Sequence, residues 1–172
     1  MCGIVGYVGS KDCADVLIDS LSKLEYRGYD SAGIAVFEKG EISVCKAKGE
    51  LKNLTEKMKK DDKPYGHCGI GHTRWATHGE PSDINSHPHG NKRVSIVHNG
   101  IIENYIKLKA FLTEKGYEFI SDTDTEIVAK LLDYYYNGNP VETIARVISE
   151  IEGSYALGII FSDFQNKVFA VR

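Results

Sequence analysis

The sequence predicts a mixed α+β fold, because short strand-like segments occur in groups and amphipathic helices separate some of the groups. The strand segments are rich in β-branched or aromatic residues and are bounded by Gly, Asn or Asp. Between the second and third of them, the string Glu38-Lys39-Gly40-Glu41 is typical of a hairpin turn. The predicted strands are Ile4–Val8, Ala32–Phe37, Ile42–Lys46, Cys68–Thr73, Val94–His98, Tyr155–Phe161 and Lys167–Val171.

The helices are predicted from apolar residues that recur every three or four positions and from capping residues at their ends. Thr123 and Glu126 have the spacing of a capping box. Asn139 and Pro140 form a typical cap and first helical position. The predicted helices are 14–24 with Gly28 to end it, Asn104–Lys115 before Gly116, a third from Thr123 toward Gly138, and a fourth from Asn139 to Gly153. The polar string at 59–64 is predicted to be a solvated turn.

Length and charge exclude several classes of protein. The chain has 172 residues, which is typical of one domain with its own core. Its net charge of -3 gives no reason to expect a nucleic acid or an anionic membrane surface as a partner. No apolar run is long enough to span a bilayer, and the N-terminus lacks the basic start and apolar core of a signal peptide. We therefore expect a cytoplasmic protein.

The cysteines fall into two groups. None belongs to a CxxC pair, so neither a zinc ribbon nor a redox motif is indicated. In a reducing compartment, Cys13, Cys45 and Cys68 are expected to be free and mostly buried thiols. Cys2 differs because it directly follows Met1 and precedes a predicted strand, which can hold a terminal group rigidly.

Removal of Met1 would give Cys2 a thiol and an α-amine on one residue. The α-amine has a reference pKa of about 7.7–8.0, so a large fraction is neutral near physiological pH. It can take the thiol proton directly or through a water, and the cysteine then needs no separate histidine base. An incidental cysteine is the ordinary interpretation of position two, and the strand that follows favours a nucleophile.

Longer motifs carry a resemblance to a known family. The motifs are Met1-Cys2-Gly3-Ile4, Tyr26-Arg27-Gly28-Tyr29-Asp30-Ser31-Ala32-Gly33, His72-Thr73-Arg74-Trp75-Ala76-Thr77-His78-Gly79, Asn85-x-His87-Pro88-His89, His98-Asn99-Gly100-Ile101-Ile102-Glu103-Asn104 and Ser121-x-Thr123-Asp124-Thr125-Glu126. The first of them resembles the start of the class-II glutamine amidotransferases, and the others are most similar to the amino-sugar branch, the glucosamine-6-phosphate synthases. The string from His72 to Gly79 is highly specific, whereas Asn99-Gly100 alone is a weak signal.

The resemblance implies a fold, an activity and partners. The fold is a four-layer αββα sandwich of the N-terminal-nucleophile hydrolase type, here truncated at the C-terminus. Residues 1–172 form an incomplete glutaminase domain, and the sugar-isomerase domains of the full-length enzyme are absent. The activity is hydrolysis of L-glutamine to glutamate and ammonia. In the full-length homodimer the ammonia serves synthesis of glucosamine 6-phosphate from fructose 6-phosphate, with no cofactor in the glutaminase domain.

The resemblance also assigns roles to residues around the nucleophile. Arg74 is expected to bind the substrate α-carboxylate through two parallel hydrogen bonds, against the alternative of a surface arginine at a strand end. Asp124 is expected to bind the α-ammonium, although an acid is also favourable at a helix N-terminus. Asn99 and Gly100 are expected to form the oxyanion hole, against the alternative of an ordinary Asn-Gly turn.

Further residues are expected to support this site. Trp75, Thr77 and His78 resemble a mobile loop over the bound glutamine, although Trp75 could equally be a core residue. Arg27 is expected to steady the N-terminal segment, and His87 to order the loop near the site. The six histidines lack the spacing of a zinc site, so no metal is expected.

Two alternatives remain open from the sequence. One is a glutaminase domain that feeds a different acceptor, as in the purine branch, against which the string Arg74-Trp75-Ala76-Thr77-His78 argues. The other is a truncated, non-catalytic interaction module kept from a degraded enzyme. Loss of Cys2, Asn99 or Asp124 would have indicated such a module, and all three residues are present.

Overall fold

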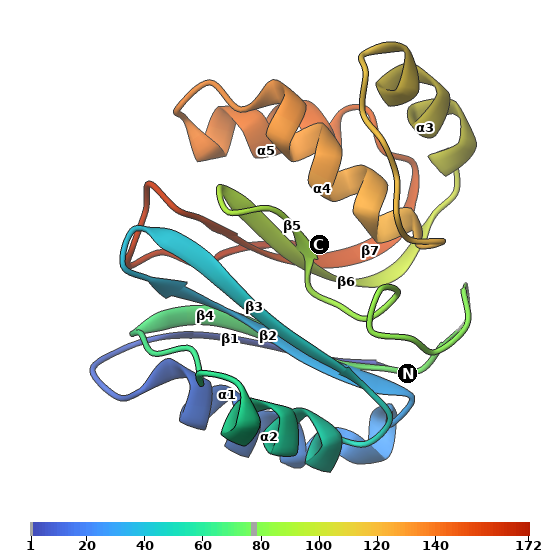
Figure 1. The fold of residues 1–172 in the computed structure, drawn as a ribbon. Helices are drawn as coiled ribbons and strands as arrows, with labels where there is room; N and C mark the ends of the chain where they lie inside the picture. The colour runs from blue at the N-terminus through green and yellow to red at the C-terminus, as the bar shows by residue number, and fades with distance from the viewer. Residues whose placement is uncertain (1, 77–78) are drawn as a thin grey trace.

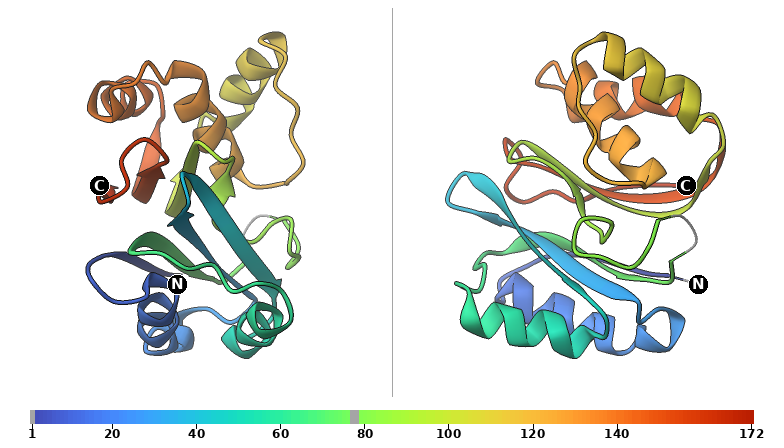
Figure 2. Two further views of the ribbon diagram at one scale, coloured as in Figure 1. Left: turned by 60° about the vertical axis from the view of Figure 1, so that its left-hand side comes forward. Right: turned by 45° about the vertical axis from the view of Figure 1, so that its right-hand side comes forward.

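Two antiparallel sheets lie face to face in the computed structural model, which describes residues 2–76 and 79–172, and helices cover the outer face of each sheet (Figure 1). The views of Figure 2 show the same four layers from the side, with helices above and below the paired sheets. None of the described helices is long and apolar enough to cross a lipid bilayer.

The first sheet is built from the N-terminal half of the chain. Its strand order is β1-β4-β2-β3, so β4 lies between β1 and β2. Two helices, α1 and α2, cover its outer face with buried side chains such as Leu17, Leu21 and Leu54. The elements are β1 (Gly3–Val8), α1 (Cys13–Ser22), the short 3-10 helix η1 (Glu25–Arg27), β2 (Ser31–Glu38), β3 (Glu41–Lys48), α2 (Leu51–Lys60) and β4 (Cys68–Arg74).

The second sheet is built from the rest of the chain. Its strand order is β5-β6-β7-β8, and its outer face packs against α3, α4 and α5. Leu131, Leu132 and Val147 of these helices are buried against Ile96 and Ile159 of the sheet. The elements are β5 (His89–Gly90), β6 (Val94–Ile102), α3 (Tyr105–Glu114), α4 (Asp124–Tyr135), α5 (Pro140–Ile148), β7 (Gly153–Phe161) and β8 (Phe169–Val171).

A third apolar cluster lies between the two sheets. Ile70 from β4 packs in it with Val97 from β6 and Ile160 from β7, and all three are fully buried. One core lies between the sheets and one lies under each helix layer, so three cores separate four layers of secondary structure. The four-layer α+β expectation is therefore confirmed, and each predicted strand lies within an observed strand or overlaps one.

Local chemistry explains the predicted ends. The hairpin between β2 and β3 turns at Lys39 and Gly40, whose φ angles of 50° and 92° are those of a two-residue turn with both residues left-handed. Asn139 caps α5 by accepting from the backbone of Val141 and Glu142. Thr123 caps α4 as expected.

The capping box at α4 is only half formed. The Glu126 carboxylate accepts from the backbone N–H of Ser121 at 2.7 Å and of Ile120 at 3.1 Å, in place of the N–H of Thr123. Glu126 thus ties the loop before the helix to the first turn of α4. This loop lies next to the residues that the motifs assign to the substrate.

Some predicted boundaries were wrong. Lys59 and Lys60 end a helix that was not predicted, although Leu51, Leu54 and Met58 have helical spacing on one face. The lysine-rich remainder of α2 gave the segment its loop-like composition. The first helix ends at Ser22 and is followed by η1, the fourth ends at Ile148, Gly153 begins β7, and the two-residue strand β5 was missed.

Candidate active site

The candidate site lies at one end of the layer between the sheets. Gly3 of β1 pairs with Thr73 of β4, so Cys2 lies one residue before the paired segment and beside the end of β4. Side chains alternate along a strand, so His72 of β4 lies on the same face as Ile70, two residues earlier, and points toward the second sheet. Asn99 of β6 meets His72 from the other sheet.

Cys2 is held at the end of β4 by the backbone. The N–H of Trp75 donates to the Cys2 Sγ at 3.2 Å, and Sγ lies 3.6 Å from the Trp75 carbonyl oxygen. Gly28 packs against the same peptide, since a Cβ at Gly28 would lie 2.7 Å from the carbonyl carbon of Arg74. Only glycine permits this approach, which explains the glycine in the motif that contains Arg27.

Asn99 connects Cys2 to the second sheet. Its Nδ2 donates to the carbonyl oxygen of Cys2 at 3.0 Å, and its Oδ1 lies 2.9 Å from His72 Nε2. That Nε2 also lies 3.1 Å from the carbonyl oxygen of His98. Both neighbours of Nε2 are acceptors, so Nε2 carries the hydrogen and fixes the orientation of the Asn99 amide. An amide nitrogen has two hydrogens, and among the described residues only Cys2 uses one of them.

Gly100 lies inside a strand, and the Asn-Gly turn considered as the alternative is wrong. Asn99 pairs with Ala156 and Gly100 with Tyr155 in the β6–β7 ladder. The φ angle of Gly100 is 128°, and a Cβ there would lie 2.0 Å from the carbonyl oxygen of Ser154. Glycine is therefore required at this position by conformation and by space.

Arg74 and Asp124 line the same small pocket as Cys2 and Asn99. Arg74 is 5% exposed, and its Nη2 donates to the carbonyl oxygen of Gly79 at 3.2 Å, so it is not a surface arginine. Burial lowers the pKa of Arg74, and the charges of Cys2, Asp30 and Asp124 oppose this effect. A buried guanidinium close to a carboxylate suits a zwitterionic ligand.

Asp124 also has a structural contact. It stands in the first turn of α4, and its Oδ2 accepts from the backbone N–H of Ile102 at 2.8 Å. Its Oδ1 lies 3.8 Å from His98 Nδ1. The carboxylate thus fastens α4 to β6 and still lines the pocket, so both interpretations of Asp124 are compatible with its position.

Three buried histidines, His72, His87 and His98, line the pocket, and His89 packs behind His87; of these four, only His87 was expected to support the site. His72 and His87 stack with ring centroids 4.2 Å apart, and His87 Nδ1 accepts from the backbone N–H of His98 at 3.2 Å. Burial lowers the pKa of His72 to about 4 and the pKa of His87 and of His89 well below the usual value. Burial also lowers the pKa of His98, whose Nδ1 lies 2.9 Å from Thr125 Oγ1.

These rings form a neutral, closely packed wall. Thr125 Oγ1 lies 2.9 Å from His98 Nδ1 and 3.3 Å from His87 Nε2, and no group of three His, Cys, Asp or Glu residues in 2–76 and 79–172 is arranged to hold a metal ion. The repeated appearance of histidine on or beside predicted strands was the available signal for this wall.

The remaining predicted site residues lie at the rim. Trp75 is 46% exposed and packs beside Tyr29, with ring centroids 5.5 Å apart, so its alternative as a core residue is wrong. Arg27 lines a second cavity that also touches Cys2 and Asn99. Thr77 and His78 lie outside the described residues, as does Met1.

A family model described as a glutamine amidotransferase domain matches residues 72–172, more than half of the chain. The chain belongs to the glutamine amidotransferase domain family. It is 58% identical over 175 residues to the glutamine–fructose-6-phosphate aminotransferase (isomerizing) of Clostridium acetobutylicum and 51% identical over 185 residues to that of Methanosarcina mazei. All of this amidotransferase chain is covered in both alignments, but it spans only 28% and 29% of the two relatives.

Solved structures support the fold of this amidotransferase domain. The glutamine phosphoribosylpyrophosphate amidotransferase of B. subtilis matches 94% of the chain, using 35% of its own length, at 26% identity and a TM-score of 0.78. An allosteric regulatory enzyme of purine biosynthesis matches 94% of the chain, using 36% of its own length, at 24% identity and a TM-score of 0.81, which shows the fold alone. The expected N-terminal-nucleophile type of fold is confirmed.

The histidine wall makes stability sensitive to mild acid. Burial holds the pKa of His72 at about 4 in the folded chain, against 6.5 as its ordinary value. Between these values the unfolded chain binds more protons, so the free energy of unfolding falls as the pH falls from about 6.5 to about 4. Each such histidine contributes up to about 1.4 kcal/mol per pH unit. Urea unfolding at pH 7.5 and pH 5.5 measures the loss.

Exposed and buried histidines provide the controls for this prediction. His67→Gln changes an exposed ring and serves as the comparison, and His89→Gln removes a buried ring and is expected to reduce the pH dependence. Equal free energies of unfolding at the two pH values would show that the wall does not resist protonation.

Proposed function

We propose that this chain hydrolyses L-glutamine to glutamate and ammonia, with Cys2 as the nucleophile after Met1 is removed. The observation that carries the proposal is the composition of one pocket. The Cys2 thiol, the Asn99 amide, a buried guanidinium from Arg74 and a carboxylate from Asp124 all line it. A carboxamide substrate with a zwitterionic head group needs such a set. Its amide needs a nucleophile and a donor for the oxyanion, and its head group needs one positive and one negative side chain.

The chemistry starts with the α-amine of Cys2. The free amine takes the Sγ proton, and Sγ attacks the side-chain carbonyl carbon of glutamine, which forms a C–S bond. The tetrahedral intermediate collapses, the C–N bond breaks, and ammonia leaves with the proton that the amine held. Water then adds to the γ-glutamyl thioester, releases glutamate and restores the thiol.

The oxyanion that forms during attack needs donors that are already in place. Asn99 Nδ2 donates one of its hydrogens to the Cys2 carbonyl oxygen, and its second hydrogen is proposed to be donated to the oxyanion. His72 holds the amide in this orientation through Oδ1, so we assign it a positioning role. Gly100 lies next to Asn99 on the pocket wall and is proposed to supply its backbone N–H as the second donor.

The head group is proposed to lie between Arg74 and Asp124. Two parallel N–H groups of the Arg74 guanidinium match the two oxygens of the α-carboxylate, and the carboxylate of Asp124 accepts from the α-ammonium. Trp75 lies at the rim, where it can cover bound glutamine. We propose that Thr77 and His78 continue this cover, that Arg27 steadies Cys2, and that His87 orders the wall behind the pocket.

The fate of the ammonia concerns a longer protein. The chain spans about 28% of the length of the curated relatives, whose names give fructose 6-phosphate as the second substrate. We propose that residues 1–172 belong to the glutaminase domain of such an enzyme, and that the ammonia serves formation of glucosamine 6-phosphate. Sugar-isomerase domains and a second copy of the full-length chain are the proposed partners.

Replacement of the nucleophile tests the proposal directly. Cys2→Ala abolishes glutamate release and leaves the fold intact, because only the thiol forms the thioester. A glutamine-like electrophile labels Cys2 in the unaltered chain and spares Cys13 and Cys68, which are buried. Peptide mass spectrometry locates the label and also reports whether Met1 has been removed.

Cys45 supplies a matched control, since it is free and half-buried like Cys2. Cys45→Ala retains full glutamate release. Hydrolysis retained in Cys2→Ala would contradict the proposal, as would a label on another cysteine in a chain that still hydrolyses glutamine.

A double cycle separates substrate binding by Asp124 from its contact with β6. Asp124→Asn keeps an oxygen that can accept from the Ile102 N–H but loses the negative charge. It lowers kcat/KM for glutamine, and it lowers kcat/KM little further for a glutamine analogue without the α-amino group, which the unaltered chain already uses poorly. An equal penalty on both substrates would make Asp124 a structural residue only.

A further inference from the structure

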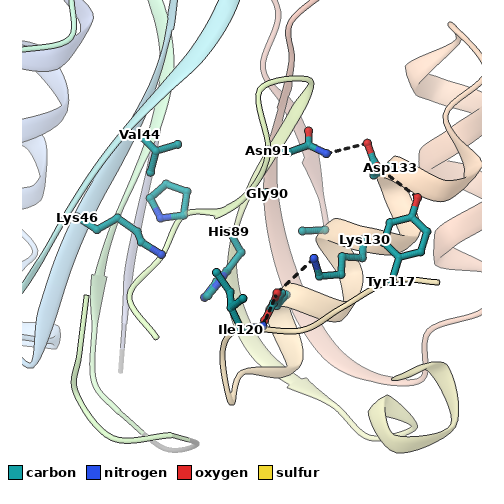
Figure 3. Close-up of a pocket in the computed structure, with 12 residues that line it drawn as sticks. Val44, Lys46, His89, Gly90, Asn91, Tyr117, Ile120, Lys130 and Asp133 are labelled. Atoms are coloured by element: carbon teal, nitrogen blue, oxygen red, sulfur yellow. Dashed lines mark hydrogen bonds and ion pairs between the residues drawn. The ribbon is translucent and has the colours of Figure 1, made fainter. Parts of the chain in front are cut away.

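Another pocket, lined in part by His89, opens between the two halves of the fold (Figure 3). One wall is the edge strand β3, from which Lys46 reaches across the pocket, and the other wall is α4 with Lys130 and Asp133. The cavity holds about 220 Å³, below the roughly 300–1,000 Å³ of pockets for drug-sized ligands. A ligand of this pocket is therefore small.

The acids of this pocket already have partners. Asp133 accepts from Arg93, from Asn91 at 2.8 Å and from the Tyr117 hydroxyl at 3.0 Å. Glu126 accepts from the backbone and the hydroxyl of Ser121, each at 2.7 Å, and lies 3.3 Å from Lys130 Nζ. Neither carboxylate needs a further cation.

Lys46 is different, because it has no carboxylate within 4.0 Å among the described residues. Its ammonium has three hydrogens, and the structure gives it one acceptor, the carbonyl oxygen of Ile84 at 3.2 Å. Burial lowers the pKa of Lys46 to about 8, so the ammonium is incompletely solvated. Among the described residues, Lys46 therefore forms no ion pair within 4.0 Å, and the charges of Glu126 and Asp83 act on its ammonium from beyond that distance.

The rest of the lining is largely apolar. Val44, Pro88, Ile120 and Ala129 line the pocket together with Lys46, and Tyr117 lines it on the side of Lys130 and Asp133. Because the Lys46 ammonium has no ion-pair partner within 4.0 Å among the described residues, the pocket favours a ligand with one negative charge. Its apolar side chains favour a ligand whose uncharged part is apolar. A dianion such as a phosphate ester would bring a second charge close to Asp133 and Glu126.

We propose that this pocket is a binding site for a small monocarboxylate, with the carboxylate on Lys46 and the apolar part against Val44, Ile120 and Ala129. The site is distinct from the glutamine pocket, because the His87 and His89 rings, with centroids 5.0 Å apart, lie between the two. His89 also contacts Thr123, the cap of α4, at 3.1 Å. The proposal does not depend on glutamine hydrolysis, since binding is measured without turnover.

Benzoate is the probe, and neutral benzamide of the same shape is the matched ligand. Titration of the 172-residue chain, followed by amide chemical shifts, is expected to give saturable binding of benzoate with the largest shifts in β3 and α4. Lys46→Met is expected to weaken benzoate by about tenfold or more, as for loss of a charged hydrogen bond. Benzamide is expected to bind the unaltered chain about tenfold or more weakly than benzoate.

Two variants complete the test. Lys48→Met removes an exposed lysine from the same strand and leaves the affinity unchanged, and Lys46→Arg keeps the charge and retains binding. Absence of saturable benzoate binding, equal affinity for benzamide, or equal affinity in Lys46→Met would each overturn the proposal. If Lys46→Met does not fold, the comparison of benzoate with benzamide on the unaltered chain decides alone.

Discussion

The meeting of the two sheets at Cys2 and Asn99 is the constraint on which the site depends. Cys2, the proposed nucleophile, lies just before β1, and the Asn99 amide that donates to its carbonyl oxygen comes from β6 in the other sheet. Ile70, Val97 and Ile160 form the apolar layer between the sheets and set their separation. A catalytic group and its oxyanion donor must be held to a fraction of an ångström, and rigid packing supplies this more reliably than a loop does.

The buried histidines connect the packed layer between the sheets to the other walls of the pocket. His72 orients Asn99, His87 stacks on His72, and His98 contacts Thr125 at the start of α4. Because the rings are buried and neutral, they fill the layer without bringing charge close to Arg74. Because Arg74 is buried, the low local dielectric screens its hydrogen bonds less than water would and strengthens them.

The features that could be predicted from the sequence are those that depend only on residues close together in the chain, such as turns and helix caps. The hairpin at Lys39-Gly40 and the cap at Asn139 follow from local backbone chemistry and lie where expected. The layer arrangement required the family resemblance, because strand order depends on contacts far apart in sequence. The helix α2 was missed because its few apolar residues are diluted by lysines.

The site was predicted unevenly for the same physical reason. The motifs drew attention to Cys2, Arg74 and Asp124, which the fold brings to one pocket. Whether Asn99-Gly100 forms a turn or a strand is decided by pairing with β7, which no local pattern reveals. The orientation of the Asn99 amide by His72 depends on a contact between the two sheets, so the sequence could not show it.

The most direct test of this account compares two reactions of Asn99→Ala. Glutamine hydrolysis passes through an oxyanion, whereas alkylation of Cys2 by iodoacetamide does not. If Asn99 stabilises the oxyanion, kcat for glutamine falls by roughly 10²–10³-fold, KM changes little, and the alkylation rate of Cys2 stays within a few-fold of the unaltered chain. An equal loss in both reactions would show that Asn99 only positions Cys2 through its carbonyl, and unchanged turnover would exclude Asn99 from the reaction.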